Sequence, residues 1–173
     1  MNSKLDLIFN RRSIRKYEDK GISREVINDI MEAAMSAPSA VNRKPYEFII
    51  IDDKNTLKEV AQYLPNGGFL SKAPLGIIVC GDIKSAHAES LSYMLQDCSA
   101  AIENLLVAVS GLGLGACWLG VHPKEDRIAG LKSIFNFPEN IIPISVISVG
   151  YPEGELPQGR TQYDAKKIHF NRW

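Results

Sequence analysis

The sequence predicts an α+β or α/β domain with about four strands, helices on both faces of the sheet and one central helix. The clearest observation is the stretch 97–112, where the few polar side chains form one narrow stripe on an otherwise apolar helix. A helix that is apolar around most of its circumference must be covered on most sides. Two apolar runs, 75–80 and 141–149, end at glycine, and the second is rich in β-branched residues. These runs predict buried strands.

The remaining elements follow from apolar periodicity and from the Ser, Asp, Gly and Pro residues that flank them. In chain order we expect helices over 3–10 and 23–37, a strand over 46–51, a helix over 56–64, a strand over 75–80, the central helix over 97–112, a strand over 116–119, a helix over 122–132 and a strand over 141–149. Residues 82–92 are polar and small, which favours a loop or a mobile helix. The tail after residue 152 is polar but ends in aromatic residues, so we expect it either to fray or to dock on a partner subunit.

The composition excludes several classes of protein. The chain has 173 residues, which fits one domain, and its 20 basic and 20 acidic residues cancel. No global field therefore recruits nucleic acid or an anionic membrane. We expect neither a transmembrane helix nor a secretory signal, and hence a cytoplasmic protein. Cys80, Cys98 and Cys117 lie far apart in apolar runs, and the three histidines are scattered, so we expect neither a disulfide framework nor a metal site.

The first candidate site is the basic segment 11–17, which reads Arg-Arg-Ser-Ile-Arg-Lys-Tyr. Most runs of charge are simply solvated, and that interpretation stays open here. In an extended segment, however, Arg11, Ser13 and Arg15 point to the same side, because side chains alternate with a period of two. Two guanidinium groups and a hydroxyl on one side form a plausible phosphate clamp.

The second candidate is the loop 38–45, which has a proline at each end. Prolines stiffen a loop, and a stiff loop that presents Ser39, Asn42 and Lys44 could hydrogen-bond a heteroaromatic ring. The alternative is an ordinary turn whose Ser and Asn side chains cap their own backbone. A dinucleotide-binding fingerprint is excluded, because the glycines at 111–115 lack the required spacing and follow a helix instead of a strand.

Four separated motifs, taken together, resemble the FMN-dependent nitroreductase family in order and spacing. They are the basic segment 11–17, the Ala-Pro-Ser-Ala-Val-Asn sequence at 37–42, the helix and Gly-Leu-Gly-Ala-Cys-Trp-Leu-Gly sequence within 97–120, and the Val-Gly-Tyr-Pro sequence at 149–152. The resemblance covers nearly the whole chain. It implies a single α+β domain over residues 1–173, with a mixed, mainly antiparallel sheet of about four to five strands, flanking helices, a central buried helix and an extended C-terminal tail.

The resemblance also implies a homodimer with FMN in clefts at the subunit interface. Arg11, Arg12 and Ser13 would then hold the phosphate and ribityl groups, and Arg15 would lie by the pyrimidine edge of the flavin. Pro38, Ser39 and Asn42 would come from a neighbouring loop, that of the other subunit. The resemblance further implies that Trp118, Leu119 and Gly120 pass the flavin ring with backbone N–H groups near N5. Arg160 in the tail would reach the phosphate.

The function implied is that of an oxidoreductase that takes hydride from NAD(P)H onto FMN and passes electrons to an acceptor such as a nitroaromatic compound or a quinone. Arg15 would act electrostatically, and no side chain is expected to serve as a catalytic acid or base. Lys44 stands where the family usually has Gln, so its role is open. Which part of the chain covers the active site is also open. The alternatives are a flavin-storing or flavin-sensing protein on the same fold, and an interaction protein without a cofactor.

Overall fold

The core of the protein is a four-stranded antiparallel sheet with the strand order β1-β2-β4-β3. The computed structural model describes residues 5–157, 159 and 162–173. The strands are β1 (Tyr46–Ile51), β2 (Leu75–Asp82), β3 (Gly115–Gly120) and β4 (Ile141–Gly150). The β-branched run 141–149 forms β4, which lies inside the sheet and pairs with β2 on one side and β3 on the other. The α+β fold and its central strand are thus confirmed.

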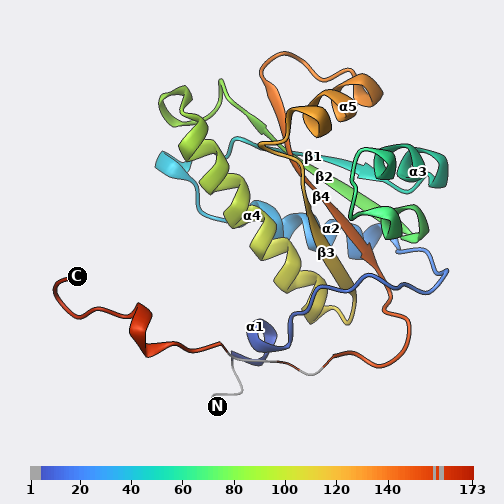
Figure 1. The fold of residues 1–173 in the computed structure, drawn as a ribbon, viewed down its shortest axis with the longest axis horizontal. Coiled ribbons are helices and arrows are strands. Elements are labelled where there is room, and N and C mark those ends of the chain that lie inside the picture. Colours follow the sequence, from blue (N-terminus) through green and yellow to red (C-terminus); the bar gives the residue numbers. More distant parts are fainter. Residues whose placement is uncertain (1–4, 158, 160–161) are drawn as a thin grey trace.

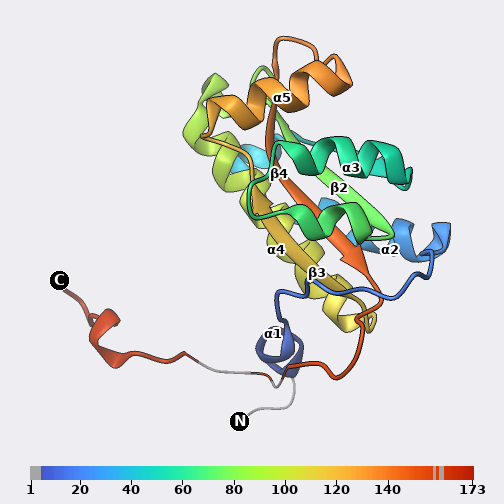
Figure 2. The same ribbon diagram turned by 45° about the vertical axis from the view of Figure 1, so that its right-hand side comes forward.

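Helices cover both faces of the sheet (Figures 1 and 2). One face packs against α2 (Arg24–Met35) and α4 (Leu91–Gly111), and the other against α3 (Lys54–Gln62) and α5 (Glu125–Phe135). Local signals explain where two of these helices begin. The Ser23 hydroxyl accepts a hydrogen bond from the Val26 N–H at 3.3 Å, and the Asp53 carboxylate accepts one from the Thr56 N–H at 2.7 Å.

The central helix α4 begins at Leu91, earlier than the expected start near Asp97. The predicted start was too late because the stretch 82–92 before it is polar and small, whereas the structure begins the helix inside that stretch and buries Met94 fully against Gly81 of β2. The helix ends as expected in the glycine-rich stretch, where Gly113 takes a left-handed conformation with φ +74. No helix in the described part of the chain is long and apolar enough to cross a membrane.

The N-terminal segment crosses the end of the sheet beside β3. The short helix α1 (Asp6–Asn10) leads into the basic segment, where Ser13 forms a parallel bridge with Ala116 and Tyr17 an antiparallel bridge with Pro152. The Ile14 N–H donates to the Ala116 carbonyl at 2.8 Å. These bonds fix the basic segment against the edge strand of the sheet.

The C-terminal tail runs from the end of β4 past α1 and then away from the domain (Figures 1 and 2). Its last described stretch contains one short 3-10 turn, Ala165–Lys167, and no buried residue. Phe170 and Trp173 are almost entirely exposed, at 85% and 102%. Because these aromatic side chains lie away from their own domain, we expect them to pack against the surface of another molecule.

Candidate functional site

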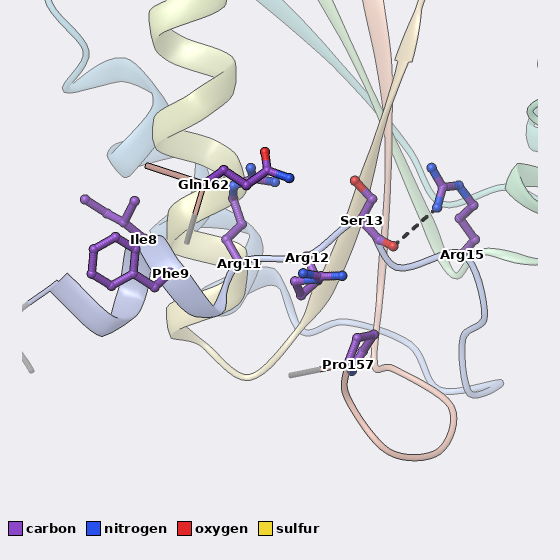
Figure 3. A pocket seen from close by; sticks show the side chains of 8 residues that line it. All are labelled: Ile8, Phe9, Arg11, Arg12, Ser13, Arg15, Pro157 and Gln162. Atoms are coloured by element: carbon purple, nitrogen blue, oxygen red, sulfur yellow. Dashed lines mark hydrogen bonds between the residues drawn. The ribbon is translucent and has the colours of Figure 1, made fainter. Parts of the chain in front are cut away.

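The basic segment lines a cavity of about 360 Å³ at the end of the domain where α1, β3 and the tail meet (Figure 3). The lining residues are Ile8, Phe9, Arg11, Arg12, Ser13, Arg15, Pro157 and Gln162. Three of the eight are arginines and none is acidic. The cavity therefore carries a concentrated positive charge in a protein whose net charge is +0. We call it the arginine cavity.

The arginines are held in different ways. The Nε of Arg11 forms a salt bridge with Glu103 of α4 at 3.0 Å, which places its guanidinium between the central helix and the cavity. Arg15 is exposed, and its Nη1 donates to the Ser13 carbonyl at 3.5 Å (Figure 3). Its guanidinium also lies 5.9 Å from the centre of the Phe69 ring. Arg11, Ser13 and Arg15, which the sequence predicts on one side of an extended segment, all line the arginine cavity, and so does Arg12 between them.

A second cavity of about 240 Å³ adjoins the first and shares Arg15 with it. We call it the β3 cavity. It is lined by Arg15, Leu64, Asn66, Gly67, Cys117, Trp118, Leu119, Gly120 and Arg127. The strand predicted over 116–119 is the edge strand β3, and Trp118 within it is 38% exposed. The open side of β3 forms one wall of this cavity.

Burial sets the ionisation of the groups around β3. Burial raises the pKa of the Cys117 thiol, and the nearby Arg15 opposes that rise only in part. Burial also raises the pKa of Tyr17, whose hydroxyl hydrogen-bonds to Ser148 of β4 at 2.7 Å. Both groups are therefore neutral at physiological pH, and Tyr17 serves to pin the basic segment to the sheet. The cationic side chains alone give the two cavities their charge.

The loop 38–45 lies elsewhere on the subunit. Ser39 accepts a hydrogen bond on Oγ from the Lys44 N–H at 2.9 Å, and the Ala40 N–H donates to Oδ1 of Asp97 at 2.9 Å. Pro38, Ser39 and Asn42 line neither cavity. A smaller cavity beside Arg11 and Arg12 is lined by Leu106 and Ser110 of α4. These two residues follow Asp97, the contact of the loop, by nine and thirteen positions, so the loop and the arginines are separated by roughly 13–20 Å along the helix. One subunit thus does not bring its own loop to its own arginines.

The conformation of this loop is strained. Val41, Asn42 and Lys44 have φ values of 52, 54 and 50, a left-handed region that residues other than glycine seldom adopt. Such strain persists only where the surroundings fix the backbone, and it is frequent at functional sites. The Asp97 carboxylate is one of those fixed points, being only 5% exposed with Oδ2 lacking any partner among the described residues.

The comparisons with known proteins settle the family. A model of the nitroreductase family matches residues 8–66 and 61–151. The chain belongs to the nitroreductase family. A relative from Methanothermobacter thermautotrophicus, provisionally named NADH dehydrogenase/NAD(P)H nitroreductase, is 43% identical over 169 residues, which are 98% of this chain and 87% of the relative. The family resemblance of the sequence is confirmed.

Two solved structures extend the comparison. A protein from Bacteroides thetaiotaomicron with the same provisional name has a TM-score of 0.91 and 42% identity, and the match covers 100% of this chain and 99% of that one. A provisionally named nitroreductase from Desulfovibrio desulfuricans, solved in complex with FMN, has a TM-score of 0.84 and 27% identity over 100% of this chain and 99% of that one.

The two cavities have the features that FMN requires. A phosphate dianion needs several cations and hydroxyls, which the arginine cavity provides. A flat ring needs an open wall with accessible backbone, which β3 provides: a side chain added at Gly120 would meet nothing within 4 Å. The residues present therefore fit the phosphate in one cavity and the ring in the adjoining one, with Arg15 between them.

The structure also shows residues that the sequence analysis missed. Arg127, Asn66 and Gly67 line the β3 cavity, Gln162 lines the arginine cavity, and Glu103 holds Arg11. Their sequence neighbourhoods are those of an ordinary helix, turn or tail, so no local pattern could have singled them out. Arg160 lies outside the described residues. Within those residues, no cluster of three His, Cys, Asp or Glu side chains could hold a metal ion.

Proposed function

We propose that the protein is a cytoplasmic, homodimeric FMN-dependent oxidoreductase, folded as a single domain over residues 1–173, which uses NAD(P)H to reduce small acceptors such as nitroaromatic compounds or quinones. The observation that carries this proposal is the pair of adjoining cavities, one rich in arginine and one walled by β3, with Arg15 shared between them. The family membership and the FMN complex of the Desulfovibrio desulfuricans relative support it.

The residues of this chain would divide the work as follows. Arg11, Arg12 and Ser13 bind the phosphate and ribityl groups, and Arg160 of the tail adds a further cation. Bound FMN supplies the redox chemistry, since its N5 accepts and donates hydride. Trp118, Leu119 and Gly120 form the wall against which the ring lies and orient it through their backbone. Arg15 stabilises negative charge at the pyrimidine edge, in the manner of a preorganised donor.

The homodimer is part of the proposal because one subunit is incomplete. Pro38, Ser39 and Asn42 are predicted to touch the flavin, yet they lie away from the cavities of their own subunit. Between the two regions, α4 carries a partly open apolar face with a cavity of about 540 Å³, lined by Ile8, Ala33, Ser36, Glu103, Asn104, Val107 and Ala108. A second copy packed on this face would bring its loop towards the arginines.

The test is direct. Purified protein should be yellow, should release about one FMN per subunit, and should oxidise NADH or NADPH when a nitroaromatic compound or quinone is present. A protein that binds FMN but fails to oxidise either nucleotide with any acceptor would favour the storage alternative. A colourless protein that takes up no added FMN would reject the proposal.

A further inference from the structure

The β3 cavity contains a second guanidinium group, which belongs to Arg127 of α5. Its Nη1 donates a hydrogen bond to the Gly120 carbonyl at 2.6 Å. Its Nε is buried and has no hydrogen-bond partner within the described residues. A buried donor without a partner is costly, so its retention calls for an explanation. The bond to Gly120 fixes the guanidinium at the C-terminal end of β3.

Within the described part of the chain, no acidic side chain lines this cavity beside its two cations. The lining contains Arg15 and Arg127 but neither Asp nor Glu. The salt bridges between described residues are Arg11–Glu103 and Lys54–Asp19, and neither uses a lining cation. Two uncompensated positive charges on a partly enclosed cavity favour a ligand that is negative or becomes negative there.

The two guanidinium groups lie towards different ends of the same wall. Arg15 is close enough to the Cys117 thiol to influence its pKa, whereas Arg127 bonds to Gly120. Cys117 and Gly120 are three residues apart, which is about 10 Å along a strand. A flat ring on this wall would therefore have one cation towards each end.

We propose that Arg127 is a second electrostatic residue for the flavin, which stabilises the negative charge of the reduced ring from the Gly120 end of the wall, across from Arg15. This inference rests on the proposed function, because it assumes that FMN occupies the β3 cavity. Two-electron reduction adds negative charge to the ring, and a fixed cation in a partly desolvated site stabilises that charge without reorganisation. Arg127 thereby makes the bound FMN easier to reduce.

Three substitutions separate the charge of Arg127 from its hydrogen bond. Arg127→Met removes both, Arg127→Gln keeps a donor for the Gly120 carbonyl, and Arg127→Lys keeps the charge. Lys124→Met is the matched control, because it removes a positive charge from the exposed start of the same helix without touching the cavity. The readouts are the dissociation constants of oxidised and reduced FMN and the midpoint potential of the bound flavin.

We expect Arg127→Met and Arg127→Gln to weaken the binding of reduced FMN about tenfold more than that of oxidised FMN, which lowers a two-electron potential by about 30 mV. The midpoint potential of bound FMN should stay close to the wild-type value in Arg127→Lys and should equal it in Lys124→Met. Thermal unfolding of each apoprotein shows whether a variant is folded. If Arg127→Met does not fold, Arg127→Gln and Arg127→Lys still give opposite predictions.

Several results would overturn the inference. An unchanged midpoint potential in a folded Arg127→Met protein would do so. An unchanged potential in Arg127→Gln, with a lowered one in Arg127→Met, would also do so, because it would show that the hydrogen bond to Gly120 matters and the charge does not. A rise in KM for 4-nitrobenzoate but not for the neutral 4-nitrobenzamide, at unchanged potential, would assign Arg127 to anionic acceptors instead. Wild-type protein that binds no FMN would reject the proposed function and this role with it.

Discussion

At the scale of single residues, Arg15 is the side chain on which the site depends most, because it lines both cavities. Arg15→Ala removes the cation expected at the pyrimidine edge. The midpoint potential of bound FMN should fall, and its reduction by NAD(P)H should slow on the order of tenfold to a hundredfold. Redox titration and stopped-flow reduction measure the two effects. Lys16→Ala is the control, since Lys16 is exposed and lines neither cavity. An unchanged potential and rate in Arg15→Ala would remove this residue from the mechanism.

The cysteines are the second case at this scale. Burial raises the pKa of both Cys80 and Cys98 to about 12, so their thiols stay protonated and unreactive in the folded protein. The unfolded thiols ionise near pH 8.5, so the contribution to stability is complete below that pH and is lost as pH rises towards 12. Each thiol should lower the free energy of unfolding by about 1.4 kcal/mol per pH unit in that window.

Urea unfolding at pH 8 and pH 10 measures this loss, and Cys98→Ala should make it shallower. A thiol reagent such as DTNB gives an independent check at neutral pH. It should modify the native protein far more slowly than the denatured one. Equal rates in the two states would show that the thiols are not protected by burial.

At the scale of elements, the contact between the basic segment and β3 positions the site. A side chain at Gly115 would lie 2.6–2.8 Å from carbon atoms of Ile14, the residue between Ser13 and Arg15. Gly115→Ala should therefore push the basic segment off the strand, destabilise the fold by about 1–3 kcal/mol and weaken FMN binding. Gly21→Ala is the control, because a side chain there meets nothing within 4 Å. Denaturant unfolding and FMN titration would detect either effect, and wild-type FMN affinity in Gly115→Ala would contradict this role for the contact.

The elements also show what a sequence can predict. The strand β4 was evident because its β-branched run is long, and α2 because Ser23 marks its start and apolar residues recur along one face. The start of α4 was misplaced because Met94 is buried by a contact with β2, which no local pattern encodes. The basic segment was identified as a site because its residues are adjacent in the sequence. Arg127 was not identified, because no local pattern links it to the site. Arg127 follows Gly120 closely in sequence, but it joins the site only because α5 folds back so that its guanidinium reaches the Gly120 carbonyl.

At the scale of the whole molecule, one subunit presents parts that it does not use itself. The loop around Ser39 is held in a strained conformation away from the cavities, and the tail carries Phe170 and Trp173 into solvent. The apolar face of α4 is partly open, although eight other residues of the helix are buried. A second copy of the chain would give each of these parts a surface to contact. The proposed flavin site therefore depends on the proposed dimer.

The dimer is best tested at Val107, which lines the cavity on the open face of α4. Val107→Glu should be tolerated in a single subunit, because the side chain is only partly buried there and can reach water. In the dimer it would bury a charge without a partner, at a cost of several kcal/mol. We expect the variant to sediment as a folded monomer and to bind FMN at least about tenfold more weakly, since each site loses the loop of the other subunit.

Val107→Ala is the matched control, because it shortens the side chain without adding a charge, and it should remain dimeric and keep its FMN. Analytical ultracentrifugation and FMN titration on the same samples give the two readouts. A Val107→Glu protein that stays dimeric would place the interface elsewhere. A monomer that keeps full FMN affinity would mean that the site needs no partner, and that Ser39 and Asn42 hold their strained loop for another purpose.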